Sequence, residues 1–396
     1  MKSVGMKMKL KTGAIVLLVS LISVSLILSQ TFLQETNYCF IFDERILADA
    51  KKVILNAHEY YDGFFYYHWN DGEALDRDWN FYNCWMDDVF YMSFGGYDMD
   101  YYRKVLVSFH KFTLMFGRTP SIIHITYPQG SNMREYGAFL YPIMVWNYWR
   151  FSGDYTIISE LRESMLLDYN FMVSLLKNNL IYLDHNLTGM PDWVYRSGYL
   201  ADMNMYFLFD LKIFAELYNF DINSQYSLTQ DALIDTLWND DLGFFIDWID
   251  VNGIKHEHFQ VEQLIGVFGD IIPEYYQQRI AESLPLHPSY AGKHWFFHPY
   301  PIQEMVLSIP DWNYVNSIRA LYFYIHILEK FNRITNQTLE EILSLYESSI
   351  RKYGFIDTYN WANGEYVKGW GFNLDCDYIF SAGAWLAIKN LIEDDN

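Results

Sequence analysis

The chain has 396 residues, enough for one large domain or for two to three domains of average size. It carries 28 basic and 49 acidic side chains, which gives a formal net charge of −21. So acidic a chain excludes non-specific nucleic-acid binding, because phosphate neutralisation needs an excess of Lys and Arg. Hydrophobic residues make up 51% of the chain, which excludes disorder over most of its length.

The sequence predicts no metal centre and no redox cofactor. The three cysteines, Cys39, Cys84 and Cys376, are odd in number and have no CxxC spacing. Neither a disulfide framework nor a zinc knuckle is expected, and a single bridge stays open for an exported chain. Four histidines show HxH and HxxxH spacings, but no patterned carboxylate accompanies them: His256, His258, His294 and His298.

The N-terminus has the pattern of a targeting segment. Residues 1–12 are basic, residues 13–33 form an uncharged and mainly apolar stretch, and residues 34–43 form a short stalk. About 20 uncharged residues suffice to span a bilayer, and lysines before the span place the N-terminus in the cytoplasm. The alternative is a cleaved signal peptide, although no A-x-A-like site follows. Both interpretations predict an exported body, either anchored in the membrane or secreted.

Residues 44–396 show helical periodicity almost throughout and no linker, which predicts one domain. Residues 338–352 begin with Thr338 and Glu341 in capping-box register. The predicted helices are 44–61, 84–95, 99–116, 135–152, 156–179, 199–219, 227–238, 258–269, 273–284, 312–331, 338–352 and 377–392. Short extended pieces with turn signals lie between them at 181–183, 244–248 and 355–359.

About twelve helices correspond to six helix pairs, with no sequence repeat at that period. Antiparallel pairs joined by alternately short and long loops can close into a ring, and the long loops then collect on one face. An open solenoid would show a more regular period and shorter loops. We therefore expect a closed ring of helices.

Aromatic residues, 19% of the chain, concentrate in the predicted loops and helix starts together with acidic side chains. Aromatic faces stack on the C–H faces of sugar rings, while carboxylates and amides bind the hydroxyls. This mixture recurs six times and indicates carbohydrate binding, in segments 60–69, 79–88, 192–196, 294–300, 310–314 and 356–361.

These segments carry a resemblance to a known family. The matching phrases are Trp85-Met86-Asp87-Asp88, Gly189 to Arg196, Leu237 to Asp247, Pro310 to Asn316, and Phe355 to Tyr359 with Gly364. In order and spacing they resemble the six-hairpin glycosidases, above all trehalases, processing α-glucosidases and mannosylglycerate hydrolases. The resemblance implies an all-α fold, an (α/α)6 barrel with short β-hairpin loops, here preceded by the N-terminal hydrophobic helix.

The resemblance also implies roles for individual residues. Asp192 takes the place of the general acid, and Asp357 takes the place of the general base, where the family has Glu. The shorter side chain leaves Glu365 as the alternative base. Asp87 would hold sugar hydroxyls, and Arg196 would fix substrate or tune a carboxylate. The full set of implied substrate contacts is Trp85, Asp87, Asp88, Trp193, Arg196, Trp312, Asn316 and Tyr359.

Glycoside hydrolysis needs two carboxyl groups that flank the scissile bond, one of them protonated. Pro191 and Trp193 give Asp192 an apolar neighbourhood suited to a raised pKa. The resembled family inverts configuration, which requires a carboxyl separation of about 6.5–9.5 Å. The predicted function is hydrolysis of α-linked gluco- or manno-configured oligosaccharides.

Other interpretations stay open. Asp192 could be a turn residue, and Asp87 and Asp88 could complement a helix dipole. The same barrel could serve an epimerase with a His acid/base or an unsaturated-uronide hydrolase, although few Lys or Arg residues lie in the aromatic loops. The missing Glu also favours a non-catalytic sugar-binding protein, which an Asp192→Asn variant would distinguish from an enzyme.

Overall fold

The computed structural model describes residues 40–67, 83–124, 135–187, 196–257, 261–284, 315–316, 318–355, 359–360, 365–366 and 379–394. The chain divides into an N-terminal unit, Met1–Phe40 together with Asn396, and a main unit, Ile41–Asp395. Every helix and strand below belongs to the main unit. The predicted span 13–33 lies outside the described residues. None of the helices that are described has the length and apolar character needed to cross a bilayer.

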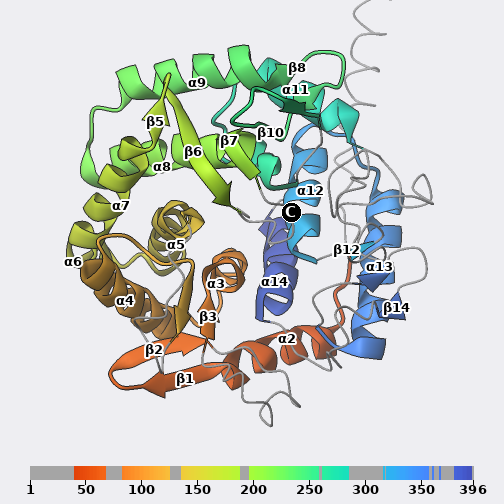
Figure 1. Ribbon diagram of the computed structural model, residues 1–396. Helices are drawn as coiled ribbons and strands as arrows, with labels where there is room; N and C mark the ends of the chain where they lie inside the picture. Colours follow the sequence, from red (N-terminus) through yellow and green to blue (C-terminus); the bar gives the residue numbers. More distant parts are fainter. Residues whose placement is uncertain are drawn as a thin grey trace, which may run out of the picture. The chain divides into compact units, whose positions relative to one another are not determined.

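The main unit is built around a ring of inner helices. Contacts run from α3 to α5, then to α8, α10, α12 and α14, and from α14 back to α3, so the ring is closed (Figure 1). The bounds are α3 (Met86–Ser93), α5 (Tyr136–Ser152), α8 (Ala201–Tyr218), 3-10 helix η3 (Val261–Leu264) leading into α10 (Ile265–Phe268), α12 (Ile318–Lys330) and α14 (Ile379–Asp394). The predicted (α/α)6 barrel is therefore confirmed.

An outer helix precedes each inner one along the chain. The outer elements are α2 (Glu44–Asn56), α4 (Met99–Phe116), α6 (Thr156–Glu160) with α7 (Arg162–Ser174), α9 (Asn223–Leu237), α11 (Glu274–Ser283) and α13 (Asn336–Tyr353). Among them, α2 packs on α14, α4 on α5, α7 on α5 and α9 on α8. These four outer helices thus cover part of the inner ring, as Figure 1 shows for α2, α4 and α9.

Burial differs between the two layers for a physical reason. An outer helix touches the core along one stripe, so α2 buries only Ile46, Leu47, Ala50, Val53 and Ile54. An inner helix has protein on nearly every side, and α5 and α8 bury most of their residues. Outer helices such as α2 and α13 therefore show a clear 3.6-residue periodicity in the sequence.

Short strands occupy the connections between helices. They are β1 (His58–Tyr61), β2 (Phe64–Tyr67), β3 (Asn83–Trp85), β4 (Ile122–His124), β5 (Leu176–Lys177), β6 (Leu180–Leu187), β7 (Arg196–Leu200), β8 (Trp238–Asn239), β9 (Phe244–Phe245), β10 (Trp248–Ile249), β11 (Lys255–His256), β12 (Val315–Asn316), β13 (Tyr359–Asn360) and β14 (Glu365–Tyr366). They form antiparallel sheets in the orders β1-β2, β3-β4, β8-β9, β11-β10-β7-β6-β5 and β12-β13-β14.

Two predicted helices extend too far, and both errors have the same cause. Helix 44–61 ends at Asn56, because Asp62 and Gly63 both have positive φ and turn the chain back between β1 and β2. Helix 156–179 ends at Ser174, because Asn178 and Asn179 do the same between β5 and β6. Two consecutive residues with positive φ make the two-residue turn that matches strand twist, and this turn favours Asn, Asp and Gly.

The N-terminal cap of α13 also differs from the prediction. The helix begins at Asn336, and the hydroxyl of Thr335 accepts a hydrogen bond from the backbone N–H of Thr338 at 3.2 Å. Thr335 therefore caps this helix, and Thr338 already lies inside it. The predicted buried face of this helix is confirmed: Leu339, Ile342, Leu343, Tyr346 and Ile350.

Candidate functional site

The connections between helices are of two lengths. Each inner helix leads to the next outer helix through a short connection: residues 94–98, 153–155, 219–222, 269–273 and 331–335. Each outer helix leads back to an inner one through a long connection: residues 57–85, 117–135, 175–200, 238–260, 284–317 and 354–378. The barrel therefore gathers its long connections at the N-terminal ends of the inner helices, as the sequence predicted.

Neighbouring long connections are hydrogen-bonded to each other in pairs. The first and second meet through β3 and β4, the third and fourth through β7 and β10, and the fifth and sixth through β12 and β13. Every residue predicted to act on substrate falls, in sequence, in a long connection or in the first turn of the inner helix that follows it. This end of the barrel is the candidate functional site.

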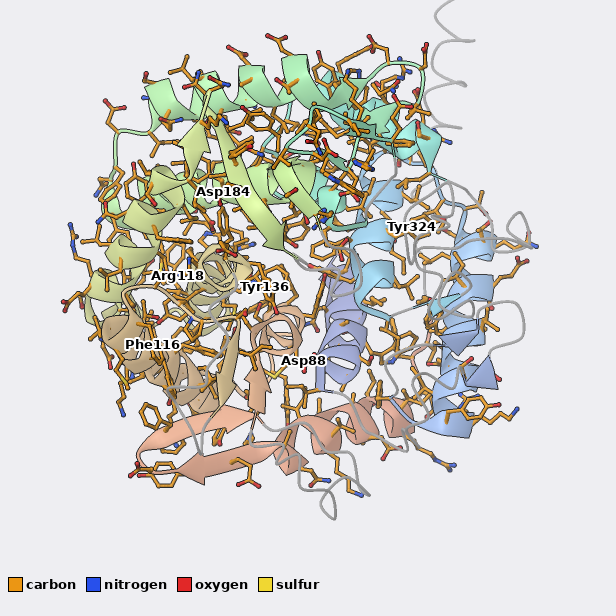
Figure 2. The ribbon with its side chains drawn as sticks, viewed as in Figure 1. Asp88, Phe116, Arg118, Tyr136, Asp184 and Tyr324 are labelled. Carbon is orange, nitrogen blue, oxygen red and sulfur yellow. The ribbon has the colours of Figure 1, made fainter. Side chains whose placement is uncertain are left out.

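At the first pair, Trp85 ends β3 opposite Ile122 of β4, and α3 begins at the next residue. The backbone N–H of Met86 donates to the carbonyl oxygen of Ser121 at 2.9 Å, which fixes the start of the helix. Asp87 and Asp88 thus occupy the first turn of an inner helix, where negative charge is favourable. Figure 2 shows Asp88 on α3, and its side chain is partly exposed. Helix α3 packs against both α5, whose first residue Tyr136 is buried, and α14.

At the third pair, a short sheet brings three predicted residues together. Asn316 of β12 pairs with Tyr359 of β13, and Asn360 of β13 pairs with Glu365 of β14. The backbone register therefore places the alternative base on the strand next to Tyr359. Four other predicted residues lie outside the described part of the chain, namely Asp192, Trp193, Trp312 and Asp357, and the predicted carboxyl separation stays a prediction.

At the second pair, Arg196 lies in a cluster of buried charges. Its Nη2 donates to Asp202 Oδ2 at 2.6 Å, and its Nη1 donates to Asp202 Oδ1 at 3.2 Å and to Asp247 Oδ1 at 2.5 Å. All three side chains are 0% exposed. Burial alone would lower the pKa of Arg196, but the charges of Asp202 and Asp247, with a smaller contribution from Glu262, raise it above its ordinary value.

This geometry narrows the role of Arg196. The sequence predicted that it fixes substrate or tunes a carboxylate. Its guanidinium is fully buried and is bound by two carboxylates. Of the two predicted roles, the structure therefore supports contact with carboxylates. Three of its acidic neighbours were not predicted to act at the site: Asp202, Asp247 and Glu262. Asp247 ends the matching phrase at 237–247, which was the only signal available for any of them.

A second arginine of the long connections is also paired. Arg118 Nη1 lies 3.6 Å from Glu135 Oε1, directly before α5, and the Arg118 guanidinium stands 4.2 Å from the ring centre of Phe171.

Among the described residues, no group of three or more His, Cys, Asp or Glu side chains could hold a metal ion. His256 instead stacks on Trp248, with ring centres 3.8 Å apart.

No protein-family profile matches the chain, and no curated protein matches it. Solved structures do. The GH63 mannosylglycerate hydrolase from Thermus thermophilus, in complex with glucose, aligns with a TM-score of 0.62 and 12% identity over 86% of this chain and 99% of that one. This chain has the fold of the (α/α)6-barrel glycosidases. The predicted resemblance is thus confirmed for the fold.

Two further glycosidases share this fold with the chain. A rhamnosidase from Klebsiella oxytoca with rhamnose bound aligns with a TM-score of 0.57 and 13% identity, over 89% of this chain and 64% of that one. Neutral trehalase from Saccharomyces cerevisiae aligns with a TM-score of 0.59 and 10% identity, over 86% of this chain and 79% of that one. The shared architecture covers most of the chain, whereas few residues are identical.

Proposed function

We propose that this protein is a glycoside hydrolase that cleaves α-linked gluco- or manno-configured oligosaccharides with inversion. One observation carries the proposal: the long connections that hold every predicted carboxyl and sugar contact lead into one end of an inner helical ring. The barrel is of the kind found in a mannosylglycerate hydrolase, a rhamnosidase and a trehalase.

Asp192 is the proposed general acid, which protonates the oxygen of the leaving group. Asp357 is the proposed general base, which takes a proton from the attacking water on the opposite face of the sugar. Glu365 is the alternative base, since β14 lies hydrogen-bonded beside β13, whose first residue follows Asp357 by two positions. Trp85, Asp87, Asp88, Asn316 and Tyr359 are the proposed sugar contacts in the described part of the chain.

The ligand of one solved barrel supports the proposed sugar configuration. The mannosylglycerate hydrolase is recorded with glucose, and a second structure of it is recorded with Tris and D-glycerate. A gluco- or manno-configured ring therefore fits a barrel of this kind.

A screen of α-linked disaccharides and oligosaccharides against the full-length protein tests the proposal. Products are followed by proton NMR from the first minutes, before the released sugar mutarotates. An inverting enzyme releases the β-anomer first from an α-linked substrate. Early release of the α-anomer contradicts inversion, and no release from any substrate contradicts hydrolysis.

A non-catalytic carbohydrate-binding protein is the second candidate, because Asp stands at position 357 where the resembled family has Glu. Calorimetric binding of a sugar that the protein never hydrolyses, with equal affinity in wild type and Asp192→Asn, would favour this candidate.

The N-terminal segment supports a proposal on location. Residues 13–33 would anchor the protein, or direct its secretion, and place the barrel outside the cytoplasm. Protease treatment of intact cells tests this: digestion of the barrel without lysis is expected, and protection until lysis contradicts it.

A further inference from the structure

The buried charge cluster around Arg196 joins two long connections and one inner helix. Arg196 is the first residue of β7, Asp202 lies in the first turn of α8, and Asp247 directly precedes β10. Strand β7 pairs with β10, and the backbone N–H of Ala201 donates to the carbonyl oxygen of Asp247 at 2.9 Å. The two ion pairs therefore add to a backbone framework that already holds these segments together.

We infer that Arg196 is a positioning residue, which holds β7 against α8 and β10 and so fixes the strand that follows the proposed general acid, Asp192, in the sequence. The inference rests on the proposed function, in which Asp192 is the general acid. Asp192 precedes Arg196 by four residues, so the held strand begins close behind the proposed acid along the chain.

The contacts of Arg196 require a guanidinium. The planar group binds both oxygens of Asp202 while it reaches Asp247 through Nη1. A lysine ammonium carries the same charge but cannot make this forked contact. The conservative variant Arg196→Lys therefore keeps the charge of the cluster and changes its geometry, which separates positioning from simple neutralisation.

The neighbouring backbone leaves little freedom at this point. Gly198, two residues after Arg196, has a φ of +95°, and a Cβ added there would lie 2.0 Å from the carbonyl oxygen of Ile249. Strands β7 and β10 therefore approach closely, so the Arg196 end of β7 is held at a fixed distance from β10. A misplacement of about 1 Å at a reacting group can lower a rate by on the order of 10²-fold.

The chain contains a matched control, Arg103. This arginine of α4 also contacts two carboxylates: its Nε donates to Asp154 Oδ2 at 2.9 Å, and its Nη2 donates to Glu160. Its side chain is 31% exposed, and Asp154 lies in the short connection 153–155, which leaves an inner helix. Arg103→Lys therefore makes the same chemical change away from the candidate site.

The experiment compares full-length wild type, Arg196→Lys, Asp247→Asn and Arg103→Lys. For each protein, kcat and KM are measured on the best substrate, and amide hydrogen exchange is followed by mass spectrometry. We expect Arg196→Lys to lower kcat by about 10²-fold with KM within about threefold, because the acid is misplaced while sugar contacts persist. Exchange should rise in peptides from 188–202 and 244–256 only. Arg103→Lys should match wild type in kcat, in KM and in the exchange of these peptides.

Two results for Arg196→Lys would overturn the inference. The first is a KM raised tenfold or more with kcat unchanged, which would mark Arg196 as a substrate ligand. The second is hydrogen exchange in peptides from 188–202 equal to that of Arg103→Lys. If Arg196→Lys does not fold, Asp247→Asn decides by the same two readings, since it removes one charge and keeps the shape of the side chain. If wild type hydrolyses no glycan, the proposed function fails, whereas hydrogen exchange still decides whether Arg196 holds this connection in place.

Discussion

Gly383 of α14 lies directly against Met92 of α3. A Cβ built on Gly383 would stand 2.5 Å from the Cα of Met92, closer than two such atoms can approach. At the same crossing, a Cβ on Gly95 would stand 2.7 Å from the carbonyl oxygen of Gly383. These are the first and the last inner helices of the chain, so glycines make possible the contact that closes the ring.

We predict that Gly383→Ala destabilises the protein. In an isolated helix, alanine would be favoured over glycine by about 1 kcal/mol. Here the added methyl group must push α14 away from the backbone of α3, and such overpacking costs about 1–3 kcal/mol. The free energy of unfolding, measured by urea denaturation of the purified protein, should therefore fall despite the gain in helix propensity.

Gly117→Ala is the control for this experiment. Gly117 follows α4 with a φ of +79°, and no atom lies within 4 Å of an added Cβ. Its replacement should cost only the strain of the left-handed conformation, about 1–2 kcal/mol, without separating two helices. A Gly383→Ala protein more stable than wild type would show that the two helices can move apart freely.

The sequence predicts those features of the fold that depend on local pattern. The predicted helix 99–116 matches α4, because its stripe of buried side chains and the glycine that ends it, Gly117, lie within one segment. The contact of Gly383 with Met92 joins residues nearly three hundred positions apart, and a single sequence contains no signal for it. The hairpins at 62–63 and 178–179 were readable from Asp-Gly and Asn-Asn, but the preceding helical periodicity concealed them.

Two buried carboxyl groups predict how stability depends on pH. Asp168 of α7 and Asp210 of α8 are both 0% exposed. Burial raises the pKa of Asp168 to about 8, although the N–H and hydroxyl of Thr119 donate to its oxygens at 2.7 and 2.6 Å. Burial, together with the nearby Asp168, also raises the pKa of Asp210 well above its usual value.

A pKa raised by folding means that the folded protein keeps a proton that the unfolded chain loses. This stabilisation is complete below about pH 4, the unfolded pKa, and it is lost as pH rises toward 8. The free energy of unfolding should fall between pH 5 and pH 8 by about 1.4 kcal/mol per pH unit for Asp168, and Asp210 should add to this fall. Denaturation at several pH values measures this slope.

Asp168→Asn should make that slope shallower, because the amide does not titrate and can still accept from the N–H of Thr119. Asp154 provides the opposite case, because hydrogen bonds from Thr156 and Arg103 lower its pKa. Its contribution to the free energy of unfolding is therefore lost only at acidic pH. Asp154→Asn should leave the slope between pH 5 and pH 8 unchanged. A wild-type free energy of unfolding that does not change between pH 5 and pH 8 would contradict the raised pKa of Asp168.

The identity of the general base is tested by comparing two variants. Asp357→Ala should abolish turnover, and azide should partly restore it, because a small anion can occupy the space of the missing carboxylate. Glu365→Ala should then keep most of the activity. If instead Asp357→Ala is fully active and Glu365→Ala is not, the base lies on β14. Initial rates with and without azide, on one substrate, distinguish the two.

Less of the candidate site than of the fold could be predicted. Trp85, Asp87 and Asp88 were identified from one short phrase and do lie together at the start of α3. The partners of Arg196 are different: Asp247 is 51 residues away, and their contact depends on the pairing of β7 with β10. Whether an arginine faces substrate or a buried carboxylate is decided by such tertiary pairing, which a motif does not encode.

Asp192→Asn tests the general acid, on which the proposed function depends. The amide has nearly the shape of the carboxyl group but cannot deliver a proton to the leaving oxygen. We expect hydrolysis of ordinary glycosides to be abolished, with sugar affinity within a few-fold of wild type by calorimetry. Substrates with an activated leaving group, such as glycosyl fluorides, need little protonation and should retain far more of their rate. A variant with wild-type turnover on ordinary glycosides would move the acid to another residue, and an equal loss on both substrate types would indicate misfolding of the site.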